Sequence, residues 1–368
     1  MNHWQKNGLP NSPAAWLITT ARRKAIDRLR KDQNFASKQR DVSYLLDLAN
    51  QSTDAEEAEV IPDKRLEMIF ICCHPALEEK TQVALTLRLI GGLSTDEIAH
   101  AFLDRPDAMQ QRLTRAKKKI AFAGIPFGIP DRDVLPERIS SVLRIVYLIF
   151  NEGYSASSGD TLTRVELSDE AVRLARIACQ LLPEETELAG LLSLMLIHDS
   201  RRHARIGKDG EMIPLEKQNR ARWDKAKIAE GHAILENTLP KGRVGPFQLQ
   251  AAISSVHAHS ASWSSTDWSQ IAALYDVLYS LQPSSVIRIN QAVAVSYAHS
   301  LPSAIKMLDE CASDGELDLY QPYFAAKADV LARLGKLSEA KTCFETAIHL
   351  SENKQEKIFL KNKMMELG

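Results

Sequence analysis

The 368-residue chain has few cysteines and no apolar run long enough to cross a membrane. Its five cysteines are odd in number and lack the spacing of metal ligands, and two of them, Cys72 and Cys73, are adjacent. This pattern favours reduced thiols over a disulfide framework. No signal peptide opens the chain either. The sequence therefore predicts a cytoplasmic protein with no membrane partner and no metal or other cofactor.

An excess of charge of one sign is also lacking, because 46 basic residues stand against 47 acidic ones. A net charge of −1 excludes a protein that coats nucleic acid over its whole surface, so any DNA contact must come from local clusters. Two clusters are present: residues 22–31 and residues 105–119 each contain six basic residues and one acidic residue. The length predicts two or three domains with an ample core.

The second cluster belongs to the stretch around which the chain is organised, residues 93–120. Ser94 is predicted to cap a short helix, and Glu97, three residues on, completes a capping box. Pro106 fits the first turn of a second helix, where its missing N–H group costs nothing. Two short helices joined by a tight turn predict a helix-turn-helix whose second helix enters the major groove of DNA.

The second helix is predicted to bury Met109, Leu113 and Ala116 and to leave amide and basic side chains in solvent. Amide and guanidinium groups can pair with base edges, whereas lysines neutralise phosphate. The candidate DNA-binding residues of this helix and the turn before it are Arg105, Gln110, Gln111, Arg112, Thr114, Arg115, Lys117 and Lys118. A solvated basic helix within a helical domain is the alternative interpretation.

The chain upstream of this motif is predicted to contain one amphipathic helix, a linker and a compact helical unit. Residues 14–31 carry an apolar face that includes Trp16 and Leu17, opposite a face of arginines. Residues 32–60 are polar and have the composition of a linker. Further helices begin after Pro62, and the last of them ends at Gly91-Gly92, directly before the helix-turn-helix.

Downstream, the proline-rich stretch over residues 126–136 marks a domain boundary. Helices are then expected over residues 139–150, 168–182, 184–198 and 223–235. A loop of small residues over 151–160 could cradle phosphate. It lacks the lysine and glycine spacing of a nucleotide site, so a structural loop is favoured.

Polar side chains gather after the expected helix at residues 184–198. They are His198, Asp199, Arg201, Arg202 and His203. Metal binding is the alternative considered, but the spacing matches no zinc-binding helix, and a polar surface is favoured. Further on, the Asp209-Gly210 pair predicts a small hairpin over residues 205–213, because this dipeptide suits a tight turn.

The last third of the chain repeats itself. An offset of 36 residues pairs Ala304 with Ala340 and Leu308 with Phe344. Small residues at helix crossings with a larger residue four positions on predict helix hairpins of the tetratricopeptide type. Residues 268–281 supply the second helix of the first hairpin. Because such stacks present a concave face, a regulatory protein or peptide is an expected partner, and a purely structural cap is the alternative.

Several long motifs resemble one protein family, the bacterial RNA polymerase sigma factors. The stretch NSPAAWLITTARRKAIDRLRK resembles the end of their region 2, and the stretch from RLEMIFICCHPALEEK to LTRAKKKI resembles region 4. The stretches LRIVYLIFNEGYSASSGD and RARWDKAKIAEGHAILE are similar to the carboxy-terminal extension of one extracytoplasmic-function group of the sigma-70 family. The resemblance starts inside region 2, so the first part of that region is expected to be missing.

The resemblance implies an all-α transcription initiation factor whose partners are RNA polymerase core and promoter DNA. Region 4 would read the −35 element, and the region 2 remnant would place Arg22, Arg23 and Arg28 on DNA. The turn of the helix-turn-helix, usually small or glycine-containing in this family, reads Leu103-Asp104-Arg105-Pro106 here.

These observations together predict a division into a region 2 remnant, a linker, region 4, a helical extension and repeats. Their ranges are 1–31, 32–60, 61–125, 126–245 and 246–368. No catalytic residue is implied, since the chemistry belongs to the polymerase. The alternative to a sigma factor is an adaptor protein built from helical repeats, in which the helix-turn-helix is vestigial. An enzyme is disfavoured, because no nucleophile–base pair or metal constellation emerges.

Overall fold

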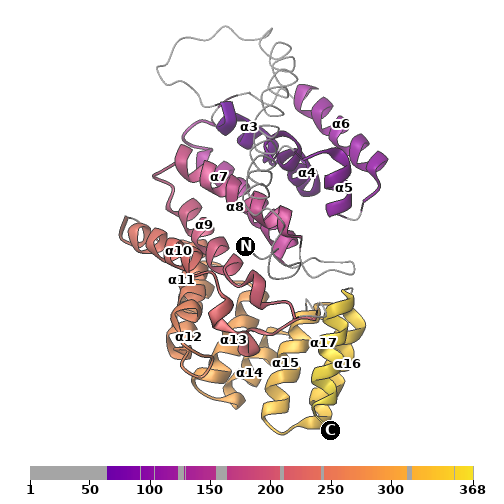
Figure 1. Ribbon diagram of the computed structural model, residues 1–368, viewed down its shortest axis with the longest axis vertical. Coiled ribbons are helices and arrows are strands. Elements are labelled where there is room, and N and C mark those ends of the chain that lie inside the picture. Colours follow the sequence, from indigo (N-terminus) through magenta and orange to yellow (C-terminus); the bar gives the residue numbers. More distant parts are fainter. Residues whose placement is uncertain are drawn as a thin grey trace, which may run out of the picture. The chain divides into compact units, whose positions relative to one another are not determined.

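The computed structural model describes residues 64–91, 93–102, 104–122, 128, 130–154, 164–207, 211–241, 244–312, 317–351 and 353–367. The chain divides into two compact units, Met1–Ser141 and Val142–Gly368. The regular structure of the described residues is helical, which confirms the predicted all-α fold (Figure 1). None of the described helices is both long and apolar enough to cross a membrane. The predicted helix over 14–31 and the predicted linker over 32–60 lie outside the described residues.

The helices described in the first unit pack around one apolar core. They are α3 (Lys64–Cys72), α4 (Glu79–Leu89), α5 (Thr95–Ala101) and α6 (Pro106–Phe122). Phe70 of α3 and Leu85 and Leu87 of α4 are completely buried in this core. The backbone N–H of Gly91 donates to the carbonyl of Thr86 at 3.0 Å and so closes the end of α4. The helix end predicted at this glycine is therefore confirmed.

Helix α7 (Leu135–Tyr154) continues four residues beyond the end predicted from the sequence, so the loop expected to begin at Asn151 was wrongly placed. Two contacts made by these residues hold the last turn. Glu152 forms an ion pair with Arg164, and both side chains are only 13% exposed. Gly153 lies against the first turn of α8 (Val165–Leu181), where an added Cβ would be 2.3 Å from the backbone nitrogen of Ser168. Residues 155–163 lie outside the described part of the chain, so the phosphate-loop alternative remains untested.

Two further long helices, α9 (Thr186–Asp199) and α10 (Lys225–Thr238), are joined by a segment with short 3₁₀ helices. These are η2 (Arg202–Ala204), η3 (Leu215–Lys217) and η4 (Arg220–Arg222), and η5 (Leu239–Lys241) follows α10. The helix predicted from Trp223 begins instead at Lys225, because the Asp224 carboxylate accepts the backbone N–H groups of Ala226 at 3.0 Å and Lys227 at 3.1 Å. Of the hairpin predicted over residues 205–213, the described residues show one isolated antiparallel bridge, between Ile206 and Met212.

The rest of the second unit is a run of helices in which each contacts the next (Figure 1). They are α11 (Pro246–His259), α12 (Trp268–Leu281), α13 (Ser285–Ala298), α14 (Leu301–Cys311), α15 (Gln321–Arg333), α16 (Leu337–Leu350) and α17 (Lys354–Met365). Helix α12 has the bounds predicted for it. The residues paired by the 36-residue offset fall on α14 and α16, where Ala304, Leu308, Ala340 and Phe344 are all buried. The sequence repeat thus corresponds to equivalent buried positions in two successive hairpins.

Candidate nucleic-acid interface

A reciprocal capping box begins the helix-turn-helix. The backbone N–H of Glu97 donates to Ser94 Oγ at 3.1 Å, and the backbone N–H of Ser94 donates to Glu97 Oε2 at 2.6 Å. These bonds satisfy donors that the first turn of a helix otherwise leaves open. The capping box predicted from the Ser94–Glu97 spacing is confirmed, and it fixes where α5 begins.

Replacing Ser94 by alanine should make α5 less stable by ~1 kcal/mol, because the helix loses its side-chain cap. Hydrogen exchange of the amides in α5 measures this effect directly, and it should become faster. Ser94→Thr, which keeps a capping hydroxyl, is the matched control and should exchange almost like the natural protein. Unchanged exchange in Ser94→Ala would show that packing alone sets the start of α5.

An ion pair holds the turn between α5 and α6. Arg112 Nη1 lies 2.7 Å from Asp104 Oδ2, and the two side chains are 31% and 25% exposed. Asp104 Oδ1 also accepts the backbone N–H of Arg105 at 2.8 Å. The hydrogen bond from Arg112 is the main reason why the pKa of Asp104 lies below its usual value. Asp104 thus ties the turn to the middle of α6 and does not cap that helix through its second or third N–H group.

The inward side of α6 is the one predicted from its spacing. Met109, Leu113 and Ala116 are 1%, 3% and 3% exposed, and the helix begins at Pro106 as expected. Five of the exposed side chains of α6 form a surface that we call the basic face of α6. Its members are Gln110, Gln111, Thr114, Arg115 and Lys118. Lys117 and Arg112 are half-buried beside it, and Arg105 is exposed in the turn.

Two side chains that the sequence did not single out also shape this surface. Thr95 Oγ1 of α5 donates to Gln110 Oε1 at 3.1 Å, which orients the amide of Gln110. Lys119 donates to the carbonyl of Ala76, in the loop before α4. A groove of about 430 Å³ runs between α4 and α6, and its wall includes Gln111 and Arg115. Thr95 and Lys119 act through contacts between different helices and loops, so the sequence pattern of α6 alone could not predict their roles.

The candidate residues Arg22, Arg23 and Arg28 lie outside the described residues, so they are not placed relative to this interface. The other eight candidates all lie on α6 or on the turn before it. Among these eight, Arg112 is the one with an ion pair to a described residue. Of the other basic candidates, Arg105, Arg115 and Lys118 are exposed and could contact a nucleic acid, whereas Lys117 is half-buried.

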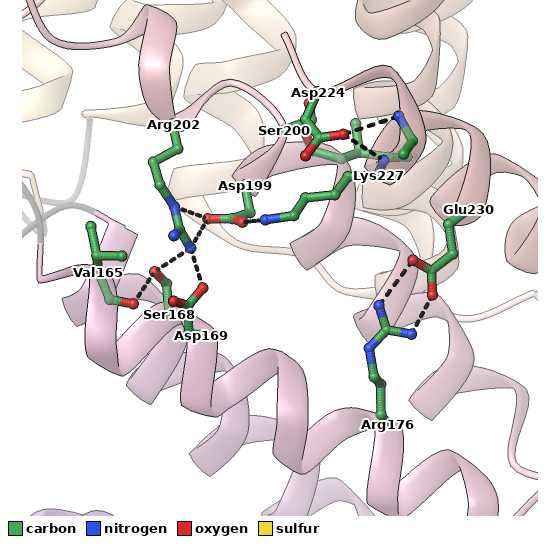
Figure 2. Close-up of polar contacts among 12 residues, drawn as sticks. Val165, Ser168, Asp169, Arg176, Asp199, Ser200, Arg202, Asp224, Lys227 and Glu230 are labelled. Atoms are coloured by element: carbon green, nitrogen blue, oxygen red, sulfur yellow. Dashed lines mark hydrogen bonds and ion pairs between the residues drawn. The ribbon is translucent and has the colours of Figure 1, made fainter. Parts of the chain in front are cut away.

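The polar residues after α9 form a partly buried network, so the predicted polar surface is wrong for this cluster (Figure 2). The side chain of Asp199 is 2% exposed, and its two oxygens accept from Arg202 Nε at 2.8 Å and from Lys227. Arg202 also pairs with Asp169 of α8 at 2.6 Å. The network therefore joins α8, α9 and α10. His203, by contrast, is exposed as expected.

The comparisons with known proteins agree with this geometry. Residues 67–120, which include the capping box, the turn and most of α6, match the family described as sigma-70, region 4. This part of the chain is therefore similar to region 4 of the sigma-70 factors. Residues 138–239 match a family of unknown function (DUF6596).

Along its whole length the chain is similar to the uncharacterized protein R00370 of Rhizobium meliloti (strain 1021). The two are 38% identical over 370 residues, a span that covers all of this chain and 87% of the relative. The chain belongs to the same family as that protein. The alignment continues through α17, so the similarity covers both the region 4 match and the helices that follow it.

Proposed function

We propose that this protein is a sigma factor of the extracytoplasmic-function group, which directs RNA polymerase core to promoters in the cytoplasm. The observation that carries the proposal is the basic face of α6, which is exposed on a helix that matches region 4. Its amides and guanidinium group are the donors and acceptors that read base edges in the major groove. The protein itself contributes no catalysis, since the chemistry of RNA synthesis belongs to the polymerase.

Within this interface we assign different roles to the basic residues. Gln111 and Arg115 lie one turn apart on the exposed side of α6, so we propose that they contact bases of the −35 element. Lys118 and Arg105 would contact phosphates at either end of the helix. Arg112 has its Nη1 bonded to Asp104, and we propose that it positions the helix by fixing the turn.

The carboxy-terminal extension is proposed to modulate this activity through a tetratricopeptide-like stack. The support is the run of hairpins from α11 to α16 and the 36-residue offset that relates α14 to α16. Such stacks bind proteins or peptides on their concave side, and we propose a regulatory protein or peptide as the partner. The domain boundaries given for residues 61–125, 126–245 and 246–368 form part of this proposal.

The test uses the full chain bound to RNA polymerase core and a pool of random DNA duplexes. Selection should enrich one −35-type sequence. For the enriched duplex, Arg115→Ala should weaken binding by roughly 10- to 100-fold and relax discrimination at one base pair. Lys118→Ala should weaken binding to all duplexes alike. It should also make the plot of log affinity against log salt concentration less steep, by about the slope that one phosphate contact contributes.

Lys341→Ala serves as the matched control, because Lys341 is an exposed lysine on α16 in the extension. It should leave both the affinity and its salt dependence unchanged. The proposal fails if no sequence is enriched, or if Arg115→Ala and Lys341→Ala bind the selected duplex equally well.

A further inference from the structure

Three arginines of the second unit converge where α9 ends. Arg201 immediately precedes η2, Arg205 follows η2, and Arg220 opens η4. Helices η2 and η4 contact each other, and the Arg220 guanidinium reaches α11 by donating to the carbonyl of His257 and, at 2.7 Å, to that of Ser260. Residues from three sequence-distant segments thus enclose one region of the protein.

Nitrogen atoms in this region are buried without hydrogen-bond partners. They are Arg201 Nε, Arg220 Nη2, Trp223 Nε1 and His257 Nδ1. Trp223 is 3% exposed, and the guanidinium of Arg220 lies 4.7 Å from the centroid of its ring. An unpaired buried donor costs on the order of 1–3 kcal/mol, and more when it is charged. Three of these atoms are obligate donors, and His257 Nδ1 is a donor in one tautomer of the ring, so the cluster indicates a ligand that accepts hydrogen bonds.

Ion pairs among the described residues do not neutralise the positive charge in this region, although the carboxylate of Asp199 favours the charged form of Arg205. Burial and then the charge of Arg201 lower the pKa of both Arg220 and His257, and that of His257 falls to about 4. Among the described residues, none forms an ion pair with Arg201, Arg205 or Arg220. The carboxylate of Asp199 is close in sequence, but Figure 2 shows both its oxygens engaged by Arg202 and Lys227.

We propose that Arg201, Arg220, Trp223 and His257 form a binding site for a small tetrahedral oxyanion, phosphate or sulfate. The available groups are guanidinium, indole and imidazole nitrogens, and a set of nitrogen donors without a free carboxylate selects an anion. Donors arrive from η2, η4 and α11. Four oxygens in a tetrahedral arrangement can accept from several directions, whereas the two oxygens of a carboxylate lie in one plane.

Such an anion would join the segment between α9 and α10 to the helical stack. This segment already contacts the stack at two places. Arg220 binds the end of α11, and Lys217 lies 3.4 Å from Glu366, just after α17. An anion held between η2, η4 and α11 adds charge-assisted bonds across the same boundary. Its binding should therefore stabilise the second unit, independently of whether region 4 binds promoter DNA.

The test measures binding of inorganic phosphate and of sulfate to the full chain by calorimetry and by the shift in melting temperature. Chloride and acetate at equal ionic strength serve as comparison anions. We expect saturable binding and stabilisation by phosphate, sulfate or both, and the tighter of the two identifies the ligand. We expect neither chloride nor acetate to reproduce this stabilisation.

Arg201→Gln is the decisive variant, because this side chain has no described ion-pair partner to lose and its replacement removes a buried unpaired donor. Without added anion it should be as stable as the natural protein or more so, and it should bind the anion at least about tenfold more weakly. The matched control is Arg222→Gln, an exposed arginine in the same η4 turn, which should bind like the natural protein.

Nuclear magnetic resonance supplies a readout that a structural role alone would not move. Phosphate or sulfate should shift the indole N–H signal of Trp223, and it should raise the pKa of His257 above about 4 by offsetting the charges of Arg201 and Arg220. Equal stabilisation by all four anions, or unchanged affinity in Arg201→Gln, would overturn the proposal and leave water as the partner of these donors.

Discussion

Replacing Asp199 by alanine should destabilise the second unit by about 3–5 kcal/mol. The carboxylate is buried between Arg202 and Lys227, so its removal takes the buried counter-charge from two partly buried cations and leaves Arg202 only its pair with the exposed Asp169 (Figure 2). Urea unfolding of the full chain, followed by the fluorescence of Trp223, Trp263 and Trp268, measures the loss.

Two further variants separate the charge of Asp199 from its hydrogen bonding. Asp199→Asn keeps one acceptor for Arg202 and should lose less stability than alanine does. Asp318→Ala removes an exposed carboxylate from the same unit and should change the free energy of unfolding by less than about 0.5 kcal/mol. Equal effects of Asp199→Ala and Asp318→Ala would contradict the importance of the buried network.

Replacing Gly153 by alanine should destabilise the same unit by about 3 kcal/mol or more, the upper range for overpacking. The new Cβ would lie 2.3 Å from the backbone nitrogen of Ser168 and 2.9 Å from the carbonyl carbon of Leu167. Backbone atoms cannot move aside as a flexible side chain can. At an exposed helical position the same substitution would instead stabilise by ~1 kcal/mol, so the sign of the change is informative.

Calorimetric melting of the full chain is the measurement for Gly153→Ala, and Gly128→Ala is its control. A Cβ added at Gly128 would meet no atom within 4 Å, so that variant should melt like the natural protein. Should Gly153→Ala melt at the natural temperature, α7 and α8 would not be in the close contact described above.

The features that could be predicted from the sequence depend on neighbours three or four positions apart. The capping box of Ser94 and Glu97 and the inward stripe of α6 are set by helix geometry alone. The bounds of α12 follow similarly, because Asp267 caps its start by accepting the Gln270 N–H at 2.9 Å. The kind of residue at these positions was therefore enough to predict their structure.

The features that could not be predicted depend on residues brought together across long stretches of chain. Helix α7 continues to Tyr154 because Arg164 and the start of α8 return to it. Arg201 and Arg220 meet near His257 only after α9, α10 and α11 have packed. A run of polar residues such as 198–203 looks alike in the sequence whether it faces solvent or lies between helices, so its burial had to come from the structure.

The ion pair between Asp104 and Arg112 has a consequence for counting the phosphates that this protein touches. The pair spans the turn that orients α6, and it is partly exposed, so dissolved ions screen it as they screen contacts with DNA. Raising the ionic strength would therefore loosen the turn while it also weakens the protein–phosphate contacts. The slope of log affinity against log ionic strength would then include the weakening of the Asp104–Arg112 pair. A number of phosphate contacts calculated from this slope would exceed the number that the protein makes.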